Sequence, residues 1–286
     1  MKNLSSFALL LALLTACGSK STEIKNTIPT LSKKWTTDTL LTTVESVIYD
    51  KTNDVLYAAN INGDPSAKDG NGSIGKVGLD GKIIDAQWVK GLNAPKGLGL
   101  FNGKLYVADI DKIVEIEVAS GKILNSYAVD SALFLNDVTT DASGRVFVSD
   151  MNRKNIVLLE NGKVSIWLEN LSDNPNGLFS EDKQMLIALW NNKTLNSIDL
   201  TSKGITLKAD SLENPDGIEA VGDGGHLVSS WNGLVHYVAP DGKVTKLLDT
   251  TADKFSAADI EYIPEKNLLL VPTFFKNTIV AYELKK

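Results

Sequence analysis

A short motif recurs along this chain at intervals of about forty residues. It begins with an apolar residue or proline, followed by a polar residue, a small or acidic residue and an aliphatic residue. The polar position holds Glu45, Lys96, Asn136, Asn176 and Asp216, and residues 258–261 read as a degenerate sixth copy with Asp259 there. Such a period indicates an array of equivalent structural units. The polar residue changes from copy to copy, and an array builds a site at such a position.

Each copy is followed by the same pattern of runs and turns. A short apolar run leads to a turn rich in Asp, Gly and Asn, and a second apolar run follows, as in residues 105–108 and 146–149. These turn residues suit tight hairpins, and the runs have the length and apolar character of buried strands. Four short strands per unit, repeated six times, predict an all-β, six-bladed β-propeller of four-stranded antiparallel blades. We expect residues 35–41 to supply the outer strand of the blade that ends near residues 279–282.

The amino-terminal residues resemble a bacterial lipoprotein signal peptide. An apolar run over residues 4–14 follows Lys2, and residues 14–17 read Leu-Thr-Ala-Cys, which is similar to a lipobox. The run is too short for a permanent span, which needs about 20 apolar residues. The resemblance implies a signal peptide over 1–16, lipidation of Cys17, a flexible tether over 17–34 and a propeller domain over 35–286. An ordinary signal peptide is the alternative.

The resemblance to a lipoprotein signal peptide implies a location, and the charge of the chain limits the expected partners. We expect a lipid-anchored protein of the bacterial cell envelope, on the outer membrane and facing the periplasm, that touches the membrane only through the lipid on Cys17. The formal net charge is −6 and no Lys/Arg cluster is present, so nucleic acid is not an expected partner. Cys17 is the only cysteine of the chain, which rules out an intrachain disulfide.

The polar motif residues are expected to converge. Each is followed by the end of a second strand at nearly constant spacing: fifteen positions from Glu45 to Asn60, Asn136 to Met151 and Asp216 to Trp231, and fourteen from Lys96 to Ile110 and Asn176 to Trp190. In a closed ring the innermost strands line the central channel, so these side chains should meet at its mouth. Trp190, Trp231 and Asn60 would either wall a substrate pocket there or, for the aromatic residues, pack between blades.

The converging side chains suit a hard metal ion. Two carboxylates and two amides without His or Cys form an oxygen-rich site, which favours Ca²⁺, Mg²⁺ or Mn²⁺, although Zn²⁺ also binds carboxylates. Glu45 and Asp216 would repel each other when brought together. A positive charge must therefore accompany them, and it is either a divalent cation or the ammonium of Lys96.

With these residues in these positions, the chain resembles the senescence-marker-protein/gluconolactonase family, also called regucalcin-like, over residues 35–286. The segment that starts at Glu45 is similar to the family's opening ligand segment, residues 136–138 to its Asn-Asp-Val substrate segment, and residues 175–178 and 215–218 to its second and third ligand motifs. The resemblance implies one divalent cation, calcium preferred and Zn, Mg or Mn possible, held by Glu45, Asn176 and Asp216. Asn136 would bind substrate or a metal-bound water, and Asp216 would also act as general base.

The implied activity is hydrolysis of a sugar-type lactone by a metal-dependent lactonase at the channel mouth. Two residues depart from the pattern. Phe134 stands where some family lactonases carry an arginine that grips the sugar acid, and Lys96 would either bind a substrate carboxylate or displace the metal. The alternative is a non-catalytic propeller that binds a small ligand or a protein partner. Strictosidine-synthase-like enzymes share the expected fold, but no residue of this chain favours their activity.

Several further residues carry expectations of their own. The insertion over residues 62–73 is longer than the matching loops. A lid over the mouth is one interpretation. A calcium loop, suggested by Asp69, Asn71 and Ser73, is another, although Ile74 stands where such a loop needs its glycine. Asp109 and Asp150 are expected to shape turns. Asp137 would either orient Asn136 or bond its own backbone. The only histidines, His226 and His236, fall inside strand runs away from the motif.

Overall fold

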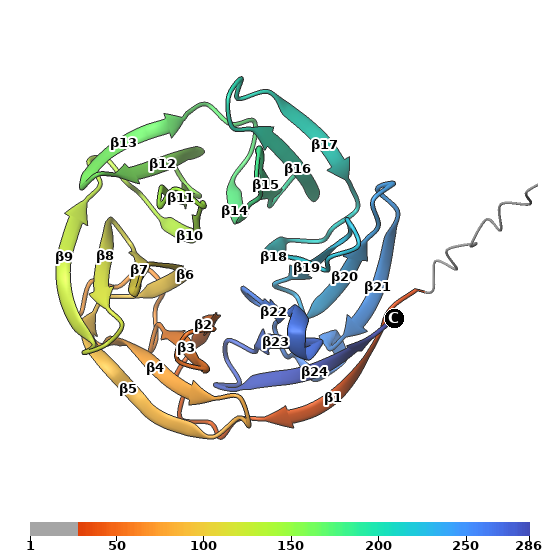
Figure 1. Cartoon of the computed structure of the whole chain (residues 1–286), viewed down its shortest axis with the longest axis horizontal. Coiled ribbons are helices and arrows are strands. Elements are labelled where there is room, and N and C mark those ends of the chain that lie inside the picture. The colour runs from red at the N-terminus through yellow and green to blue at the C-terminus, as the bar shows by residue number, and fades with distance from the viewer. Residues whose placement is uncertain (1–27) are drawn as a thin grey trace, which may run out of the picture.

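The structure is a computed structural model that describes residues 28–286. Twenty-four strands form six sheets, each with four antiparallel strands, arranged as a ring around a central axis (Figure 1). The innermost strands are β2, β6, β10, β14, β18 and β22, and each stands next to the axis in the order of the chain (Figure 1). The predicted six-bladed β-propeller is confirmed.

The strands follow one another blade by blade. The first three blades contain β2 (Val44–Asp50), β3 (Val55–Asn60), β4 (Gly72–Gly78) and β5 (Ile83–Leu92); β6 (Pro95–Phe101), β7 (Lys104–Asp109), β8 (Lys112–Glu117) and β9 (Lys122–Ala128); and β10 (Leu135–Thr140), β11 (Val146–Asp150), β12 (Asn155–Glu160) and β13 (Lys163–Leu168). The last three contain β14 (Pro175–Ser180), β15 (Gln184–Leu189), β16 (Thr194–Asp199) and β17 (Ile205–Ala209); β18 (Pro215–Ala220), β19 (His226–Ser230), β20 (Leu234–Val238) and β21 (Val244–Asp249); and β22 (Glu261–Ile263), β23 (Leu268–Pro272), β24 (Ile279–Lys285) and β1 (Thr30–Thr36). Short 3₁₀ turns lie at Thr251–Asp253 and Pro264–Lys266.

The ring closes through β1, which pairs with β24 so that the first and last strands lie in one blade (Figure 1). This outer strand is Thr30–Thr36, so the predicted range of 35–41 was wrong, and residues 30–34 belong to the blade and not to a tether. Trp35 pairs with Ala281 and packs against the core of the closing blade, after which the chain turns and buries Leu41. The expected signal peptide and Cys17 lie outside the described residues, so the lipid anchor and the envelope location stay predictions.

The apolar runs pack between neighbouring blades. Tyr57 and Ile74 of the first blade, for example, share a buried cluster with Leu105 and Val107 of the second. Burial of such faces on both sides of every sheet is what stabilises the ring. Within residues 28–286 no helix is long and apolar enough to cross a bilayer.

A β-bulge at the start of the innermost strand directs the motif's polar residue. In the third blade Leu135 pairs with Asp150 and Val138 with Val148, so Asn136 and Asp137 oppose the partner strand out of register. The same shift follows Pro95, Pro175 and Pro215, and in the first blade it lies between Val44 and Ser46. Bulges re-aim side chains without ending a strand. The repeated motif is therefore the sequence of a bulge whose second residue turns toward the mouth of the channel.

Candidate functional site

The mouth of the ring holds a cavity of about 250 Å³, and the five polar motif residues line it together with Trp190 and Trp231. Its floor is a polar ring, which we define as Glu45, Lys96, Asn136, Asn176 and Asp216, each from a different blade. The structure thus brings these side chains together, while the role of each stays a prediction.

The sixth blade breaks the polar ring. Asp259 packs against Gly217 and forms a β-bridge with Ser46. Gly217 and Ser46 are each the third residue of their motif. Ala258, not Asp259, therefore occupies the polar position, and the degenerate copy is offset by one residue from the expected alignment. The small Ala258 leaves room for Phe274, with which it shares a buried cluster.

Asn136 and Asn176 form an ordered amide pair on the floor. The amide nitrogen of Asn136 donates to Oδ1 of Asn176, and Nδ2 of Asn176 donates to the carbonyl oxygen of Pro215 at 3.2 Å. These contacts fix which end of the Asn176 amide faces its neighbour. An amide oxygen has two lone pairs, so Oδ1 of Asn176 keeps one for another partner.

Glu45 and Asp216 are buried carboxyls, 6% and 3% exposed. Oε2 of Glu45 has no hydrogen-bond partner among the described residues. Burial, then repulsion from Asp216, raises the pKa of Glu45 well above its usual range, against the opposing effect of Lys96. Burial, reinforced by the charge of Asp137, raises the pKa of Asp216 to about 8. Bringing these two groups together is unfavourable unless a cation or protons accompany them.

Lys96 is 1% exposed and directs its ammonium mainly to backbone atoms. Nζ donates to the carbonyl oxygens of Pro65 and Ala94 at 2.9 and 3.1 Å and lies 4.3 Å from the centre of the Phe134 ring. Burial lowers the pKa of Lys96 to about 8, and nearby carboxylates, Glu45 foremost, oppose the change. An ammonium has three donors, so one N–H remains for a ligand. Pro65 belongs to the insertion, which therefore reaches the mouth.

An apolar ring stands above the polar one. It consists of the residue that follows the second strand of the first five blades and, in the sixth blade, the second residue after that strand, namely Ile61, Ile110, Met151, Trp190, Trp231 and Phe274. In four blades the N–H of this residue donates to the carbonyl that precedes the innermost strand: Ile61 to Thr43, Met151 to Phe134, Trp190 to Asn174 and Trp231 to Asn214. All members except Ile110 line the cavity, together with Pro65, Phe134 and Phe275.

In the first blade this position belongs to Ile61, so the expected role of Asn60 was wrong. Asn60 pairs with Val44 one residue earlier and donates to the carbonyl of Ala86 at 3.0 Å, away from the cavity. The first blade has a longer connection between motif and strand end, and a shift of one residue turns a strand side chain to the other face. The spacing of sixteen from Glu45 to Ile61 carried the signal.

The other aspartates singled out from the sequence accept hydrogen bonds from backbone N–H groups. Asp109 accepts the backbone N–H groups of Asn93 and Ala94, and Asp150 accepts those of residues 133, 134 and 153, which confirms their turn-shaping role. Asp137 accepts the N–H of Val138 at 2.6 Å and of Leu178 at 2.5 Å, and so it ties two blades together and does not orient Asn136. Neither His226 nor His236 lines the mouth cavity.

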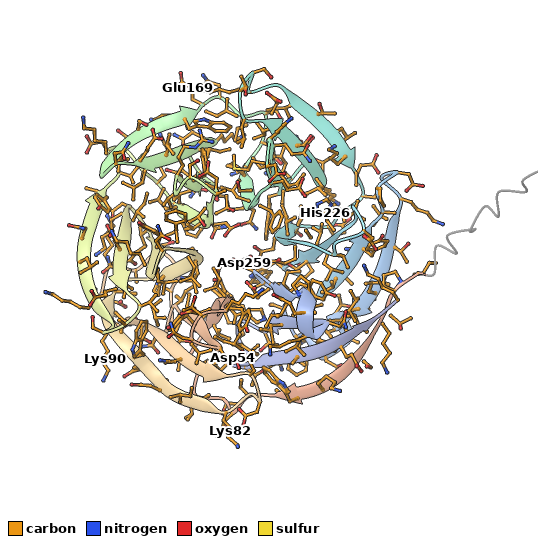
Figure 2. The ribbon with its side chains drawn as sticks, viewed as in Figure 1. Asp54, Lys82, Lys90, Glu169, His226 and Asp259 are labelled. Carbon is orange, nitrogen blue, oxygen red and sulfur yellow. The ribbon has the colours of Figure 1, made fainter. Side chains whose placement is uncertain are left out.

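A second, acidic cavity of about 270 Å³ occupies the far end of the channel. It is lined in part by Asp137, Asp259, Glu219 and Glu261, and Figure 2 shows Asp259 beside the axis of the ring. Sequence reasoning missed Glu219 and Glu261, although both stand two positions after the third residue of their motifs. Within residues 28–286 no three carboxyl, imidazole or thiol groups are placed to share one metal ion. A cation at the mouth would therefore need amide oxygens besides Glu45 and Asp216.

Structural comparison finds propellers of similar architecture. A streptogramin B lyase superposes with a TM-score of 0.66 at 12% identity, covering 90% of this chain and 98% of that chain. A catalytically inactive virginiamycin B lyase from Staphylococcus aureus with quinupristin gives 0.64 at 14% identity, covering 90% and 100%. A chain of a nidogen/laminin complex gives 0.59 at 17% identity, covering 69% and 76%. The chain matches no family model and no curated protein. At these identities the likeness shows the fold.

Proposed function

We propose that this protein is a divalent-cation-dependent hydrolase that opens a lactone in the mouth cavity, as its resemblance to the gluconolactonase family implies. The observation that carries the proposal is the unpartnered Oε2 of Glu45, buried next to a second carboxyl, Asp216. A buried carboxylate oxygen without a partner is costly, and a cation between the two groups removes that cost.

The donor set fits a hard cation. Glu45, Asp216 and Oδ1 of Asn176 are oxygen donors of the kind that Ca²⁺, Mg²⁺ and Mn²⁺ prefer, and Asn136 orients the amide. In this proposal Lys96 stands beside the ion, because its hydrogen bonds go to the carbonyls of Pro65 and Ala94 and leave Oε2 of Glu45 unpartnered.

The residues of the floor can divide the work of ester cleavage. A bound cation would polarise the lactone carbonyl. Asp216 would accept a proton from the attacking water, a role that needs an ionised carboxylate within hydrogen-bond reach of that water. The remaining N–H of Lys96 would donate to an oxygen of the substrate, and Asn136 would help to orient the ring. Trp190 and Trp231 would exclude bulk water from the floor.

Two of the structural neighbours are lyases, so this architecture can carry an enzyme's active site. A propeller hosts many unrelated functions, so the choice between enzyme and binding protein depends on the site. Two features favour an enzyme: paired buried carboxyls at the bottom of a cavity, and a buried lysine with a free donor beside them.

The proposal is tested with the purified chain and a panel of lactones, with and without a chelator. We expect turnover that chelation abolishes and Ca²⁺ or another divalent ion restores. Glu45→Gln and Asp216→Asn should each lower kcat/KM by about 10³-fold, the scale of losing a cation ligand or an acid–base group. Glu219→Gln is the matched control, because Glu219 is a channel carboxyl of the far cavity.

The result decides between the two candidate functions. Cation-dependent turnover that falls in both floor variants and persists in the control supports the hydrolase. Ligand binding without turnover, unchanged by chelation, supports the non-catalytic propeller instead, in which Lys96 alone would balance the two carboxyls.

A further inference from the structure

The floor of the cavity has few hydrogen-bonding groups left for a substrate. Asn136 and Asn176 bond to each other, Asn176 also bonds to Pro215, and two donors of Lys96 go to backbone carbonyls. What remains is the carboxylate oxygens, the second lone pair of Oδ1 of Asn176, one donor of Lys96 and the free end of Asn136. A cation bound to Glu45 and Asp216 would occupy most of those oxygens as well.

The walls offer almost no polar partner. Eight of the thirteen residues that line the cavity are apolar, and all five polar ones belong to the floor. A substrate group that points away from the floor therefore meets only carbon and sulfur atoms, apart from the indole N–H groups and the backbone. A hydroxyl buried there without a partner would be unfavourable.

Three aromatic rings form one wall and reach the rim. Trp231 lies 5.6 Å from Phe274 and 5.9 Å from Phe275, and the two phenylalanines are 4.7 Å apart, all edge to face. Phe275 is 65% exposed although it borders the cavity. An exposed aromatic ring beside an apolar cavity provides surface that a nonpolar ligand would cover.

On the opposite side of the cavity an aromatic ring covers the ammonium of Lys96. Phe134 lies against the ammonium of Lys96 and also lines the cavity. A sugar acid would need a donor at this wall, and the benzyl side chain supplies none. Phe134, Trp231, Phe274 and Phe275 therefore select against polyhydroxylated rings at several points around the cavity.

We propose that the substrate of this site is an apolar lactone, one whose ring carries an alkyl chain or an aryl group, and not a sugar lactone. This inference rests on the proposed function, because it assigns the ester to the polar ring and the substituent to the apolar wall. The cavity volume of about 250 Å³ is near the low end for ligand pockets, and it suits a single ring with a short chain.

Two δ-lactones test the proposal, because they share the ester ring and differ in what it carries: δ-decalactone with a pentyl chain, and δ-gluconolactone with hydroxyls. Each buried methylene contributes about fourfold to affinity. Burial of three to four of the five carbons of the chain therefore predicts that kcat/KM for δ-decalactone exceeds that for δ-gluconolactone by about 10²-fold. Phe275→Ala should reduce this preference about tenfold, whereas Leu207→Ala, an exposed apolar residue on β17, should leave it unchanged. A preference for δ-gluconolactone, or one that Phe275→Ala leaves intact, overturns the inference.

A binding measurement separates this inference from the hydrolase proposal. The δ-lactams that correspond to the two lactones are neutral and resist hydrolysis, and Trp190 and Trp231 report their binding by fluorescence. If neither lactone is turned over, the hydrolase proposal fails, and the lactams decide the ligand class. Tighter binding of the pentyl lactam, weakened by Phe275→Ala, supports an apolar ligand. Equal binding, or tighter binding of the sugar lactam, contradicts it.

Discussion

Lys96 is the one cationic side chain of the polar ring, and its contacts determine how far it compensates the negative charge of Glu45. The ammonium is held by the carbonyls of Pro65 and Ala94, so it stays near Glu45 without satisfying Oε2. It lowers the cost of burying Glu45, as its effect on the pKa of that carboxyl shows. A fixed positive charge so close to the candidate ligands also repels a divalent cation that binds to them.

We therefore expect Lys96→Met to tighten Ca²⁺ binding about tenfold, because the substitution removes a neighbouring charge and keeps the length of the side chain. Isothermal titration calorimetry on chelator-treated protein measures the change. Lys122→Met, on the exposed face of β9, serves as the control and should bind Ca²⁺ as the parent does. Weaker binding in Lys96→Met would mean that Lys96 organises the ligands and does not compete with the ion.

Single positions in the motif were predictable to the extent that the repeat is regular. The forty-residue spacing identified Lys96, Asn136, Asn176 and Asp216 as neighbours in space. It failed by one residue at Asp259 and at Asn60, where a blade departs from the common length. Because strand side chains alternate between faces, an error of one residue reverses the direction of a side chain.

At the scale of elements, the innermost strands approach each other through glycine. Gly97, Gly177 and Gly217 are the third residue of their motifs, and a Cβ atom on any of them would collide with the next blade. For Gly177 the collision is with the carbonyl oxygen of Asp216, which is backbone and cannot move aside. Close packing at the axis thus depends on these glycines and positions the polar ring.

Gly177→Ala should lower the free energy of unfolding by about 2–3 kcal/mol, because the new methyl group forces the fourth and fifth blades apart. Urea denaturation measures the loss. Gly204→Ala is a suitable comparison, since its nearest neighbour is the side-chain oxygen of Ser202 at 3.4 Å and its φ is not positive. Equal stability of the two variants would show that the inner strands tolerate wider spacing.

Strands and turns were predictable from apolar runs and turn residues, but the closing strand was not placed correctly. Residues 30–36 and 35–41 both contain apolar residues flanked by polar ones. The choice between them depends on pairing with β24 at the other end of the chain, where Trp35 meets Ala281. No local pattern encodes a register set by so distant a partner.

At the scale of the whole molecule, the axis of the ring is lined with carboxyl groups. Glu45 and Asp216 face the mouth, and Asp137, Asp259, Glu219 and Glu261 face the far cavity. The blades that carry Asp137 and Asp259 stand opposite each other across the ring (Figure 1). Burial, followed by repulsion from Asp137, raises the pKa of Asp259 well above its usual range, and burial raises the pKa of Asp137 to about 7.

Stability without metal should therefore fall as the pH rises from 6 to 9. Burial raises the pKa of Glu261 to about 8 and, with repulsion from Glu261, raises that of Glu219 well above its usual range. In the unfolded chain these groups lose their protons at about pH 4. The folded protein holds protons that the unfolded chain has released, so this stabilisation is present at low pH and disappears as the pH passes the folded pKa.

Urea midpoints at several pH values in chelator test this expectation. The midpoint of Glu261→Gln should depend less on pH than that of the parent, because glutamine mimics the protonated acid. Glu160→Gln, at an exposed strand end, should follow the parent. Identical slopes for parent and Glu261→Gln would contradict the account of the channel.

The most direct test of the central claim is the stoichiometry and affinity of divalent-cation binding to chelator-treated protein, measured by calorimetry. We predict one ion per chain at the mouth, with Ca²⁺ affinity reduced by at least about 10²-fold in Glu45→Gln and unchanged in Glu219→Gln. No binding, or binding that survives Glu45→Gln, would contradict a cation held between Glu45 and Asp216.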